Sequence, residues 1–376
     1  MKILHTSDLH LGISLCGIPL LPYQKKFCDT LCKAAENADA VIIAGDIFDT
    51  SVASAEAVRC WSELATKLCT ERKIPVIVCA GNHDGAARLA SCADLLKSAG
   101  LYISGAFEDA FTPVIIGNTA IYSMPYFNPT DAAAVLGCKP TAAEVMKSAA
   151  KKILQTADPD KCNILAAHCF AAGAVSGESD ISARASEAVG GADRIPLSAF
   201  DGFNYVALGH LHKPQTLSRP ESKTVVRYSG TPLPYSFGEA AYPKTLTIFD
   251  TETGSISETE VPLPYTLRTI EDTYENILAA AEKDEKRGDF MRITVTDRYV
   301  GDGLFMQMKE LYPNLLRFSG RQYESSDGKT VSAKEAFEMD IVTLAKRYCA
   351  EHRGDEPDSD ELKWLAEAME DIEQNG

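Results

Sequence analysis

The chain begins with three short apolar runs that alternate with segments of helical composition, and this alternation constrains its fold more than any other feature. Runs typical of buried strands lie at 2–7, 40–44 and 75–80. Segments of helical composition follow at 25–37, 54–70 and 88–98, and Ser54 stands at an N-cap position. Strands that alternate with helices in this way predict a mainly parallel sheet with helices packed on its faces.

Polar residues gather where the strand-like runs end. The first three clusters are Asp8-Leu9-His10, Gly45-Asp46-Ile47-Phe48-Asp49 and Gly81-Asn82-His83-Asp84. Later, His168 ends the apolar run 162–167, and Gly209-His210-Leu211-His212 follows the run 205–208. Of the seven histidines, only His352 lies far from these clusters. Because ligands of such sheets bind outside the carboxyl ends of the strands, we expect the clusters to converge in space.

The clusters offer more metal ligands than one ion needs. Seven side chains supply oxygen or imidazole nitrogen and no thiolate: Asp8, His10, Asp46, Asn82, His168, His210 and His212. This donor set suits a divalent ion such as Mn²⁺, and it could also hold iron or zinc. Two ions that share a bridging carboxylate would use all seven donors. Such pairs, about 3.5–4 Å apart, stabilise the attacking and leaving oxygens of a phosphoryl displacement.

The residues beside these ligands suggest further roles. His83 is placed to act as a general acid on the leaving oxygen, and Asp84 to fix its tautomer and raise its basicity. Glycines precede three of the ligands, where a tight turn from strand to loop favours a residue without a Cβ. For His5, a structural role is favoured over metal binding.

The rest of the chain predicts a second sheet and two further domains. Short strands within 101–125, a helix at 141–156 and strands at 225–228, 245–250 and 257–263 complete a second, more antiparallel set. The expected fold class is therefore α/β, with two packed mixed β-sheets flanked by helices. After Pro262-Leu263-Pro264 comes a small αβαβ unit, and after the polar break 325–329 come two helices with apolar faces, 337–348 and 362–372. The predicted domains are 1–264, 265–324 and 325–376.

In this order, the motifs D-x-H, G-D-x-x-D, G-N-H-D, a lone His and G-H-x-H resemble those of the calcineurin-type metallophosphoesterases, over roughly the first 250 residues. The resemblance implies that Asp8, His10, Asp46 and His212 surround one metal. It also implies that Asp46, Asn82, His168 and His210 surround the other, so that Asp46 bridges the pair. Asp49 matches the second acid of its motif and is interpreted as support for a ligand.

Three longer stretches resemble the SbcD family, the nuclease subunits of bacterial SbcCD complexes. They are His5 to Gly12, Ala207 to Gln215 and Arg227 to Phe237, and the loop 177–191 fits as well. This resemblance implies a Mn²⁺-dependent DNA nuclease of repair and recombination, a double-strand 3′–5′ exonuclease and a hairpin and single-strand endonuclease. It implies a DNA-binding capping domain, C-terminal helices that dock an SbcC-type coiled-coil ATPase subunit, and a homodimer within a heterotetramer.

Composition limits the alternatives. The net charge of −16 argues against a surface that coats nucleic acid generally, although bound cations and local basic residues can hold DNA. Arg184 is a candidate DNA contact or, equally, a solvated arginine, and the same choice applies to Lys213 and Arg227. Eleven cysteines without a C-x-x-C pair indicate reduced thiols in a cytosolic protein, and neither a signal peptide nor a membrane span is expected. Two other functions stay open: a small-molecule or nucleotide phosphodiesterase, and an inactive scaffold.

Overall fold

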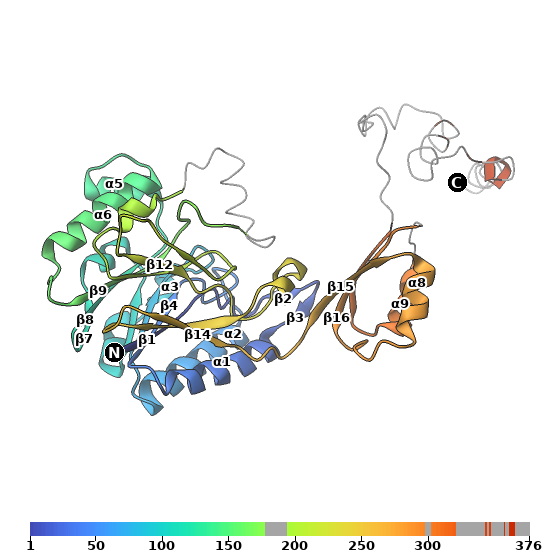
Figure 1. Ribbon diagram of the computed structural model, residues 1–376, viewed down its shortest axis with the longest axis horizontal. Coiled ribbons are helices and arrows are strands. Elements are labelled where there is room, and N and C mark those ends of the chain that lie inside the picture. Colours follow the sequence, from blue (N-terminus) through green and yellow to red (C-terminus); the bar gives the residue numbers. More distant parts are fainter. Residues whose placement is uncertain are drawn as a thin grey trace, which may run out of the picture. The chain divides into compact units, whose positions relative to one another are not determined.

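The computed structural model describes residues 1–176, 194–297 and 302–320, together with 343, 346, 357 and 361–364. These residues divide into two compact units, Met1–Arg268 and Thr269–Gly376, which are described separately (Figure 1). The loop that contains Arg184, the expected helix 337–348 except 343 and 346, and the expected helix 362–372 except 362–364 lie outside the described residues. Among the described residues, no helix is both long enough and apolar enough to cross a lipid bilayer.

The first sheet contains the three N-terminal strands predicted from the sequence. Its strand order is β14-β13-β1-β4-β5-β6. Four neighbouring strands are parallel: β1 (Lys2–Thr6), β4 (Ala40–Ala44), β5 (Val76–Cys79) and β6 (Leu101–Ser104). Two antiparallel strands, β13 (Thr245–Asp250) and β14 (Ile256–Glu260), continue the sheet beyond β1. The parallel order confirms the expectation that the ends of β1, β4 and β5 lie along one edge.

The second sheet differs in part from the prediction. Its order is β11-β12-β10-β9-β8-β7, from Gln215–Leu217, Val225–Tyr228, Tyr205–Gly209, Cys162–His168, Thr119–Met124 and Val114–Ile116 respectively. The four inner strands are parallel, and only the edge strands β7 and β11 are antiparallel to their neighbours. The expectation of a more antiparallel second sheet is therefore wrong, because β13 and β14 pair beside β1 in the first sheet instead.

A core of small and branched side chains joins the two sheets face to face. Alternate residues of β4 (Ala40, Ile42 and Ala44) pack in one cluster with Ile164 and Ala166 of β9. Tyr205 of β10 stacks on Phe249 of β13, with ring centroids 4.3 Å apart and planes at 9°. Such close-packed interiors leave little room for the sheets to slide, so the strand ends that carry the polar clusters are held in register.

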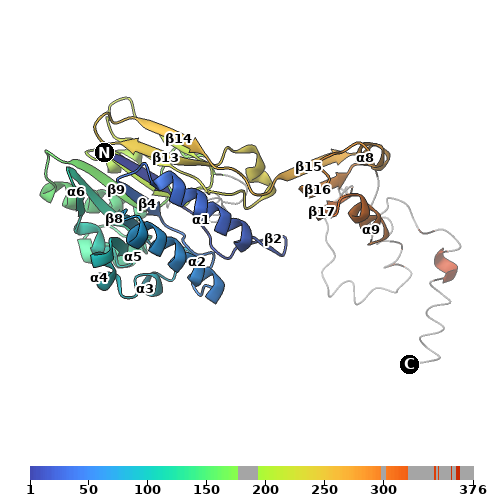
Figure 2. The ribbon, with the colours of Figure 1, turned by 90° about the horizontal axis from the view of Figure 1, so that it is seen from below.

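Helices cover the outer faces of both sheets. In unit 1, α1 (Leu21–Ala35) and α2 (Ala55–Ala65) lie side by side (Figure 2). Helix α6 (Ala142–Thr156) packs on the second sheet, and α5 (Pro129–Leu136) packs against α6. Ser54 caps α2 as predicted, since its side chain accepts a hydrogen bond from the backbone N–H of Ala57. A π-helical turn, Thr66–Glu71, continues α2.

Two local predictions need correction. The single helix expected at 88–98 is broken into α3 (Ala86–Leu89), α4 (Ala93–Leu96) and a 3-10 turn, Lys97–Ala99. The break falls where Cys92 adopts a left-handed conformation, with φ of 60°, which an α-helix cannot continue through. Helix α5 was not predicted, although Asn128 caps its N-terminus and Gly137 ends it with φ of 66°.

The remaining short elements of unit 1 lie in its connections. A hairpin of β2 (Ser14–Leu15) and β3 (Ile18–Pro19) precedes α1. The 3-10 helices span Phe107–Phe111, Leu197–Phe200 and Phe237–Ala241. The last of these proves important for the site, because it carries Glu239.

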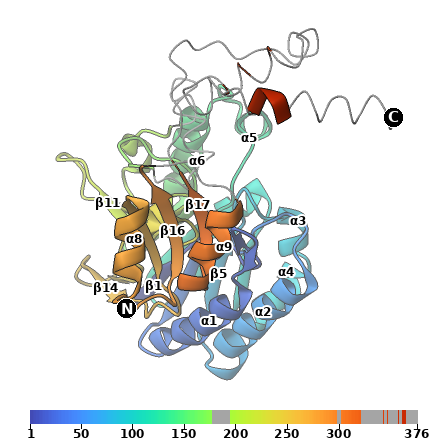
Figure 3. The same ribbon diagram turned by 90° about the vertical axis from the view of Figure 1, so that its right-hand side faces the viewer.

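Unit 2 contains the small domain predicted after residue 264, with one strand more than expected. A three-stranded sheet has the order β15-β16-β17, formed by Leu267–Asp272, Phe290–Val295 and Leu315–Ser319. Helices α8 (Tyr274–Ala281) and α9 (Asp302–Leu311) lie beside each other on this sheet (Figure 3). Ile277 of α8, Met308 of α9 and Ile293 of β16 belong to one buried cluster. The unit is thus βαβαβ, since β15 precedes the predicted αβαβ.

Candidate metal centre

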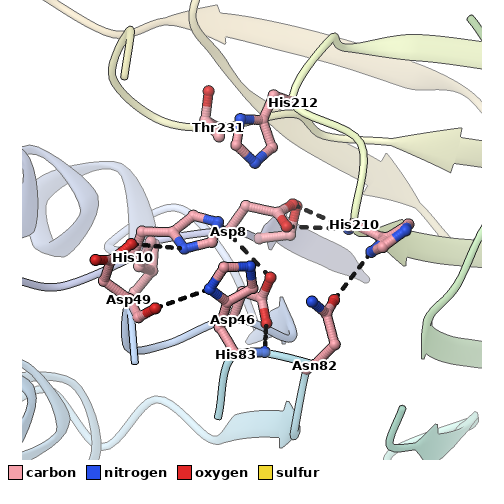
Figure 4. Close-up of polar contacts among 12 residues, drawn as sticks. Asp8, His10, Asp46, Asp49, Asn82, His83, His210, His212 and Thr231 are labelled. Carbon is pink, nitrogen blue, oxygen red and sulfur yellow. Dashed lines mark hydrogen bonds and ion pairs between the residues drawn. The ribbon is translucent and has the colours of Figure 1, made fainter. Parts of the chain in front are cut away.

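The predicted metal ligands meet at the carboxyl ends of the central strands of both sheets. Asp8 follows β1, Asp46 follows β4 and Asn82 follows β5, while His168 ends β9 and His210 follows β10. Figure 4 shows the side chains of Asp8, Asp46, Asn82 and His210 gathered in one place, with those of His10 and His212 beside them. Within three groups, ligand atoms lie within 4.8 Å of one another: Asp8, His10 and His212; Asp8, Asp46 and His168; and His10, Asp49 and His83. The predicted convergence of the clusters is therefore observed.

Asp46 lies between two sets of donors. One carboxylate oxygen, Oδ2, is 3.3 Å from Nε2 of His168 and 3.6 Å from Nε2 of His10. The other, Oδ1, accepts a hydrogen bond of 2.8 Å from the backbone N–H of His83. Burial raises the pKa of Asp46, but the neighbouring His168 more than offsets this and lowers it below its ordinary value. Asp46 is thus an ionised carboxylate that faces both sets of donors.

Asn82 joins two histidines on one side of Asp46. Its side-chain oxygen is 2.9 Å from Nε2 of His168 and 3.0 Å from Nδ1 of His210. Since Nδ1 of His168 donates to the carbonyl oxygen of Ala44 at 2.9 Å, Nε2 of this ring is the nitrogen left for a ligand. Burial lowers the pKa of His168, but the charge of Asp46 outweighs it and raises the pKa to about 9. The oxygens of Asp46 and Asn82 near Nε2 favour a positive charge there, and without a metal a proton on His168 supplies it.

His10 provides a direct test of whether cations fit the centre. Its residue is 2% exposed, and neither ring nitrogen has a hydrogen-bond partner among the described residues. The nearest carboxylate oxygens, on Asp46 and Asp49, are each 3.6 Å from a ring nitrogen. Burial of a polar atom without a partner is costly, and a cation coordinated by His10 would remove that cost. The residues present therefore fit divalent cations.

The electrostatic environment keeps two of the four ligand imidazoles, those of His10 and His210, in the neutral form that binds metals. Burial lowers the pKa of His10 and of His210 to about 3. Burial also raises the pKa of Asp8 to about 6, despite the opposing influence of His168 and His212. Neutral imidazole and ionised carboxylate are the ligand forms, so metal binding at neutral pH requires little proton release from these three residues.

His83 lies at the rim of the centre, and its orienting partner is not the predicted one. Its Nδ1 donates to the backbone carbonyl oxygen of Asp49 at 2.8 Å, which leaves Nε2 to exchange a proton. Both oxygens of Asp84 instead accept hydrogen bonds from the backbone N–H groups of Gly81, Phe48 and Ile47, at 2.8, 2.9 and 3.2 Å. The expectation that Asp84 fixes the tautomer of His83 is wrong. Asp84 ties the loop of Asp46 to the loop of Asn82.

Other predicted residues occupy definite places. His5 is completely buried within β1 and its Nδ1 is 2.8 Å from the hydroxyl of Tyr205, so it has the structural role expected. Arg227 is 5% exposed and pairs with Glu258, which excludes both the DNA contact and the solvated arginine considered for it. Lys213 lies over the ring of Tyr242, with its Nζ 5.3 Å from the ring centroid.

The sequence did not predict two residues whose side chains contact the metal ligands or their backbone on the side away from the centre. Gln24 of α1 donates to the carbonyl oxygens of Leu9 and His10, at 2.9 and 2.8 Å. Glu239 lies 3.0 Å from Nδ1 of His212. Neither stands beside a ligand in the sequence, and Glu239 comes two residues after the stretch 227–237 that resembles a known family. No spacing rule could have indicated these contacts.

Comparison with known proteins supports the interpretation of these residues as a phosphoesterase metal centre. Residues 1–214 match the family described as calcineurin-like phosphoesterase, and residues 264–353 match the type 5 capsule protein repressor C-terminal domain. Two curated relatives are each named as the D subunit of the nuclease SbcCD. The protein from Staphylococcus epidermidis is 29% identical, covering 99% of this chain and 100% of the relative. The one from Staphylococcus saprophyticus is 27% identical, covering 100% of both.

One solved structure, a dimetal phosphatase from Danio rerio, is 13% identical to this chain, with a TM-score of 0.40. The superposed region covers 66% of this chain and 91% of the phosphatase chain. That likeness is too slight to carry an argument. The match over residues 1–214 includes every predicted metal ligand, from Asp8 to His212. The chain therefore belongs to the calcineurin-like phosphoesterase family.

Proposed function

We propose that this protein is a metal-dependent nuclease that hydrolyses phosphodiester bonds of DNA with two divalent cations, of which Mn²⁺ is the expected pair. The observation that carries the proposal is the convergence of seven oxygen and nitrogen donors around the shared carboxylate of Asp46. Asp8, His10, Asp46 and His212 would hold one ion, and Asp46, Asn82, His168 and His210 the other. When bound, the ions supply Lewis acidity, which lowers the pKa of a coordinated water and offsets the charge of the phosphate.

His83 has the geometry of a proton donor in this reaction. The carbonyl oxygen of Asp49 accepts a hydrogen bond from Nδ1, so that Nε2 is the nitrogen that gives up a proton when the ring is doubly protonated. Its ring meets the ring of His10 edge to face, with centroids 4.8 Å apart, which keeps it beside the metal ligands. We infer that His83 protonates the leaving oxygen, while Asp49 supports His10 from a distance of 3.6 Å.

The substrate and partner follow from the relatives' names. Both are named as the D subunit of a nuclease, over the whole length of this chain. These names support a nuclease in a complex with an SbcC-type ATPase subunit. From the resemblance of the motifs, we also propose double-strand 3′–5′ exonuclease and hairpin or single-strand endonuclease activity. We assign residues 1–264 to the nuclease domain, 265–324 to a DNA-binding capping domain and 325–376 to docking of the ATPase, in a homodimer within a heterotetramer.

A nuclease assay with a His83 variant tests the proposal. The wild-type chain with Mn²⁺ should cleave blunt duplex, hairpin and single-stranded DNA, and Mg²⁺, Zn²⁺ and Fe²⁺ should be compared in parallel. His83→Ala should lower the rate by about 10²–10⁴-fold, the usual contribution of a general acid, and should still bind two equivalents of Mn²⁺. His10→Ala should lose both activity and an ion.

Two outcomes would contradict the proposal. Cleavage by His83→Ala at the wild-type rate would show that another group donates the proton. Rapid turnover of a cyclic nucleotide, together with no cleavage of any DNA, would favour a small-molecule phosphodiesterase.

A further inference from the structure

Glu239 is a carboxylate buried directly behind a metal ligand. It lies in the 3-10 helix Phe237–Ala241 and is 0% exposed. Its Oε1 is 3.0 Å from Nδ1 of His212. Its Oε2 accepts hydrogen bonds from the side chains of Thr231 and Lys244, at 2.8 and 2.7 Å. Both oxygens therefore have partners, and one of those partners is the imidazole that faces the metal centre.

Lys244 explains how the buried side chain of Glu239 can stay ionised. Lys244 is 2% exposed, and its Nζ is 2.7 Å from Glu239 and 2.6 Å from the hydroxyl of Thr231. An isolated carboxylate at such a site would become protonated. The ammonium group of Lys244 places the opposite charge within hydrogen-bond distance of the carboxylate, which favours the ionised form. Glu239 is therefore an ionised acceptor, and its charge is balanced within the protein.

This arrangement fixes the direction of His212. A carboxylate only accepts hydrogen bonds, so Nδ1 of His212 carries the proton and Nε2 is the atom available to an ion. The His212 ring points toward Asp8 and His10, whose ligand atoms lie within 4.8 Å of it (Figure 4). Thr231 also holds the segment from behind, because its backbone N–H donates to the carbonyl of His212 at 3.1 Å.

The other three imidazole ligands have no carboxylate hydrogen-bonded to an outer nitrogen among the described residues, and Nδ1 of His210 lies 3.0 Å from the side-chain oxygen of Asn82. His168 is oriented by a neutral carbonyl, that of Ala44, and His10 has no hydrogen-bond partner among the described residues. A carboxylate behind an imidazole raises its basicity and typically strengthens metal affinity. In the described structure, therefore, only the half that contains Asp8, His10 and His212 has an imidazole ligand whose outer nitrogen is hydrogen-bonded to a carboxylate.

We propose that Glu239 and Lys244 form a positioning pair that sets the affinity of the ion site made by Asp8, His10 and His212. The pair touches neither substrate nor metal and acts through His212. The inference rests on the proposed two-metal function, but it concerns metal binding and can be tested without a nuclease assay.

Titration of the metal-free full-length chain with Mn²⁺ alone, followed by the EPR signal of the free ion, measures the affinity for each ion. Glu239→Gln should weaken binding of one of the two ions by about 10–100-fold and leave the other unchanged. The double variant Glu239→Gln/Lys244→Met removes both buried charges. It should regain thermal stability lost in the single variant but should keep the weakened ion site.

Glu258→Gln is the matched control. Glu258 also pairs with a buried cation, Arg227, but Glu258 lies in β14 and Arg227 in β12 of the other sheet, and the hydrogen bonds and ion pairs that their side chains form in the described structure involve no metal ligand. This variant should bind two ions with wild-type affinity.

The double variant decides the question even if Glu239→Gln alone fails to fold. Wild-type affinity for both ions in the folded double variant would overturn the inference, because the pair would then serve stability only. Wild-type protein that binds no Mn²⁺ would overturn the proposed function as well, whereas two-ion binding without DNA cleavage would overturn only the choice of substrate.

Discussion

Several ligands of the metal centre are held in an unfavourable backbone conformation. Asp8, His10, Asp46 and His210 have φ values of 53°, 42°, 51° and 99°. A left-handed conformation costs a residue with a Cβ about 1–2 kcal/mol. Surrounding contacts offset this cost: the backbone N–H of His210, for example, donates to Asp8 at 3.0 Å across 202 residues of sequence. The strain turns each side chain out of its strand and toward the centre.

The proton on His168 makes the stability of the metal-free protein depend on pH. The folded-state pKa is about 9, above the ordinary value of 6.5. The folded chain therefore keeps a proton that the unfolded chain releases. This stabilisation is fully present below pH 6.5 and is lost as the pH rises through 9. Urea denaturation of metal-free protein should show the free energy of unfolding falling over this range, by up to about 3 kcal/mol.

His168→Gln supplies the control for this pH dependence. The substitution removes the titrating group, so the decline between pH 6.5 and 9 should become shallower even if the variant is less stable throughout. Equal slopes for wild type and variant would show that His168 does not bind the proton. Saturating Mn²⁺ should also reduce the slope, because an ion bound to the ligand nitrogen displaces its proton into solvent.

At the scale of the element, the turns that leave the strands determine how closely the two sheets can approach. Gly45, after β4, has φ of 87°, and a Cβ there would lie 2.1 Å from Nδ1 of His168 on the other sheet. That nitrogen already donates to the carbonyl oxygen of Ala44. A side chain at position 45 would therefore displace His168 and break this bond, so the strand end and its ligand depend on a residue without a Cβ.

Two glycine substitutions separate crowding from backbone strain. Gly45→Ala should lower the free energy of unfolding by about 3 kcal/mol or more, since overpacking adds to the left-handed strain. Gly137→Ala should cost only about 1–2 kcal/mol, because Gly137 has φ of 66° but no atom within 4 Å of the position that a Cβ would take. Chemical denaturation measures both values. Similar losses for the two variants would mean that the contact with His168 relaxes at little cost.

At the scale of the whole molecule, the metal centre belongs entirely to unit 1, Met1–Arg268, whereas unit 2 has its own core. Every predicted ligand, His83 and the pair Glu239 and Lys244 lie before residue 268. The proposed docking of the ATPase by residues 325–376 would therefore place partner binding in a different unit from the catalytic residues.

Deletion of residues 337–376 tests that division. The truncated chain should lose binding to the coiled-coil ATPase subunit in a pull-down assay, because the proposed apolar docking face is removed. It should keep both Mn²⁺ ions and should cleave simple duplex ends at the wild-type rate. Undiminished binding of the ATPase would place the docking surface elsewhere in the chain.

The sequence by itself determined the strands that carry the predicted donors and the place where the ends of those strands meet. The strands that lead to the ligands, such as β4, contain local apolar runs, and each ligand stands within a few residues of a strand end, as with Asp46 after β4. Parallel strands bring such ends to one edge, so convergence follows from local patterns and one rule of topology. The helix break at Cys92 was not predictable in this way, since its left-handed conformation has no signal in residue type.

Only the tertiary structure decided which groups hold the ligands. Asp84, next to His83 in sequence, turns to three backbone N–H groups, while Glu239 and Gln24 reach His212 and the backbone of His10 from other elements. The pairing of β13 with β1, across almost the whole of unit 1, was likewise invisible to local patterns. Residue type fixes what a side chain can bind, but packing of distant segments fixes which partner lies within hydrogen-bond distance, and that distance decides its role.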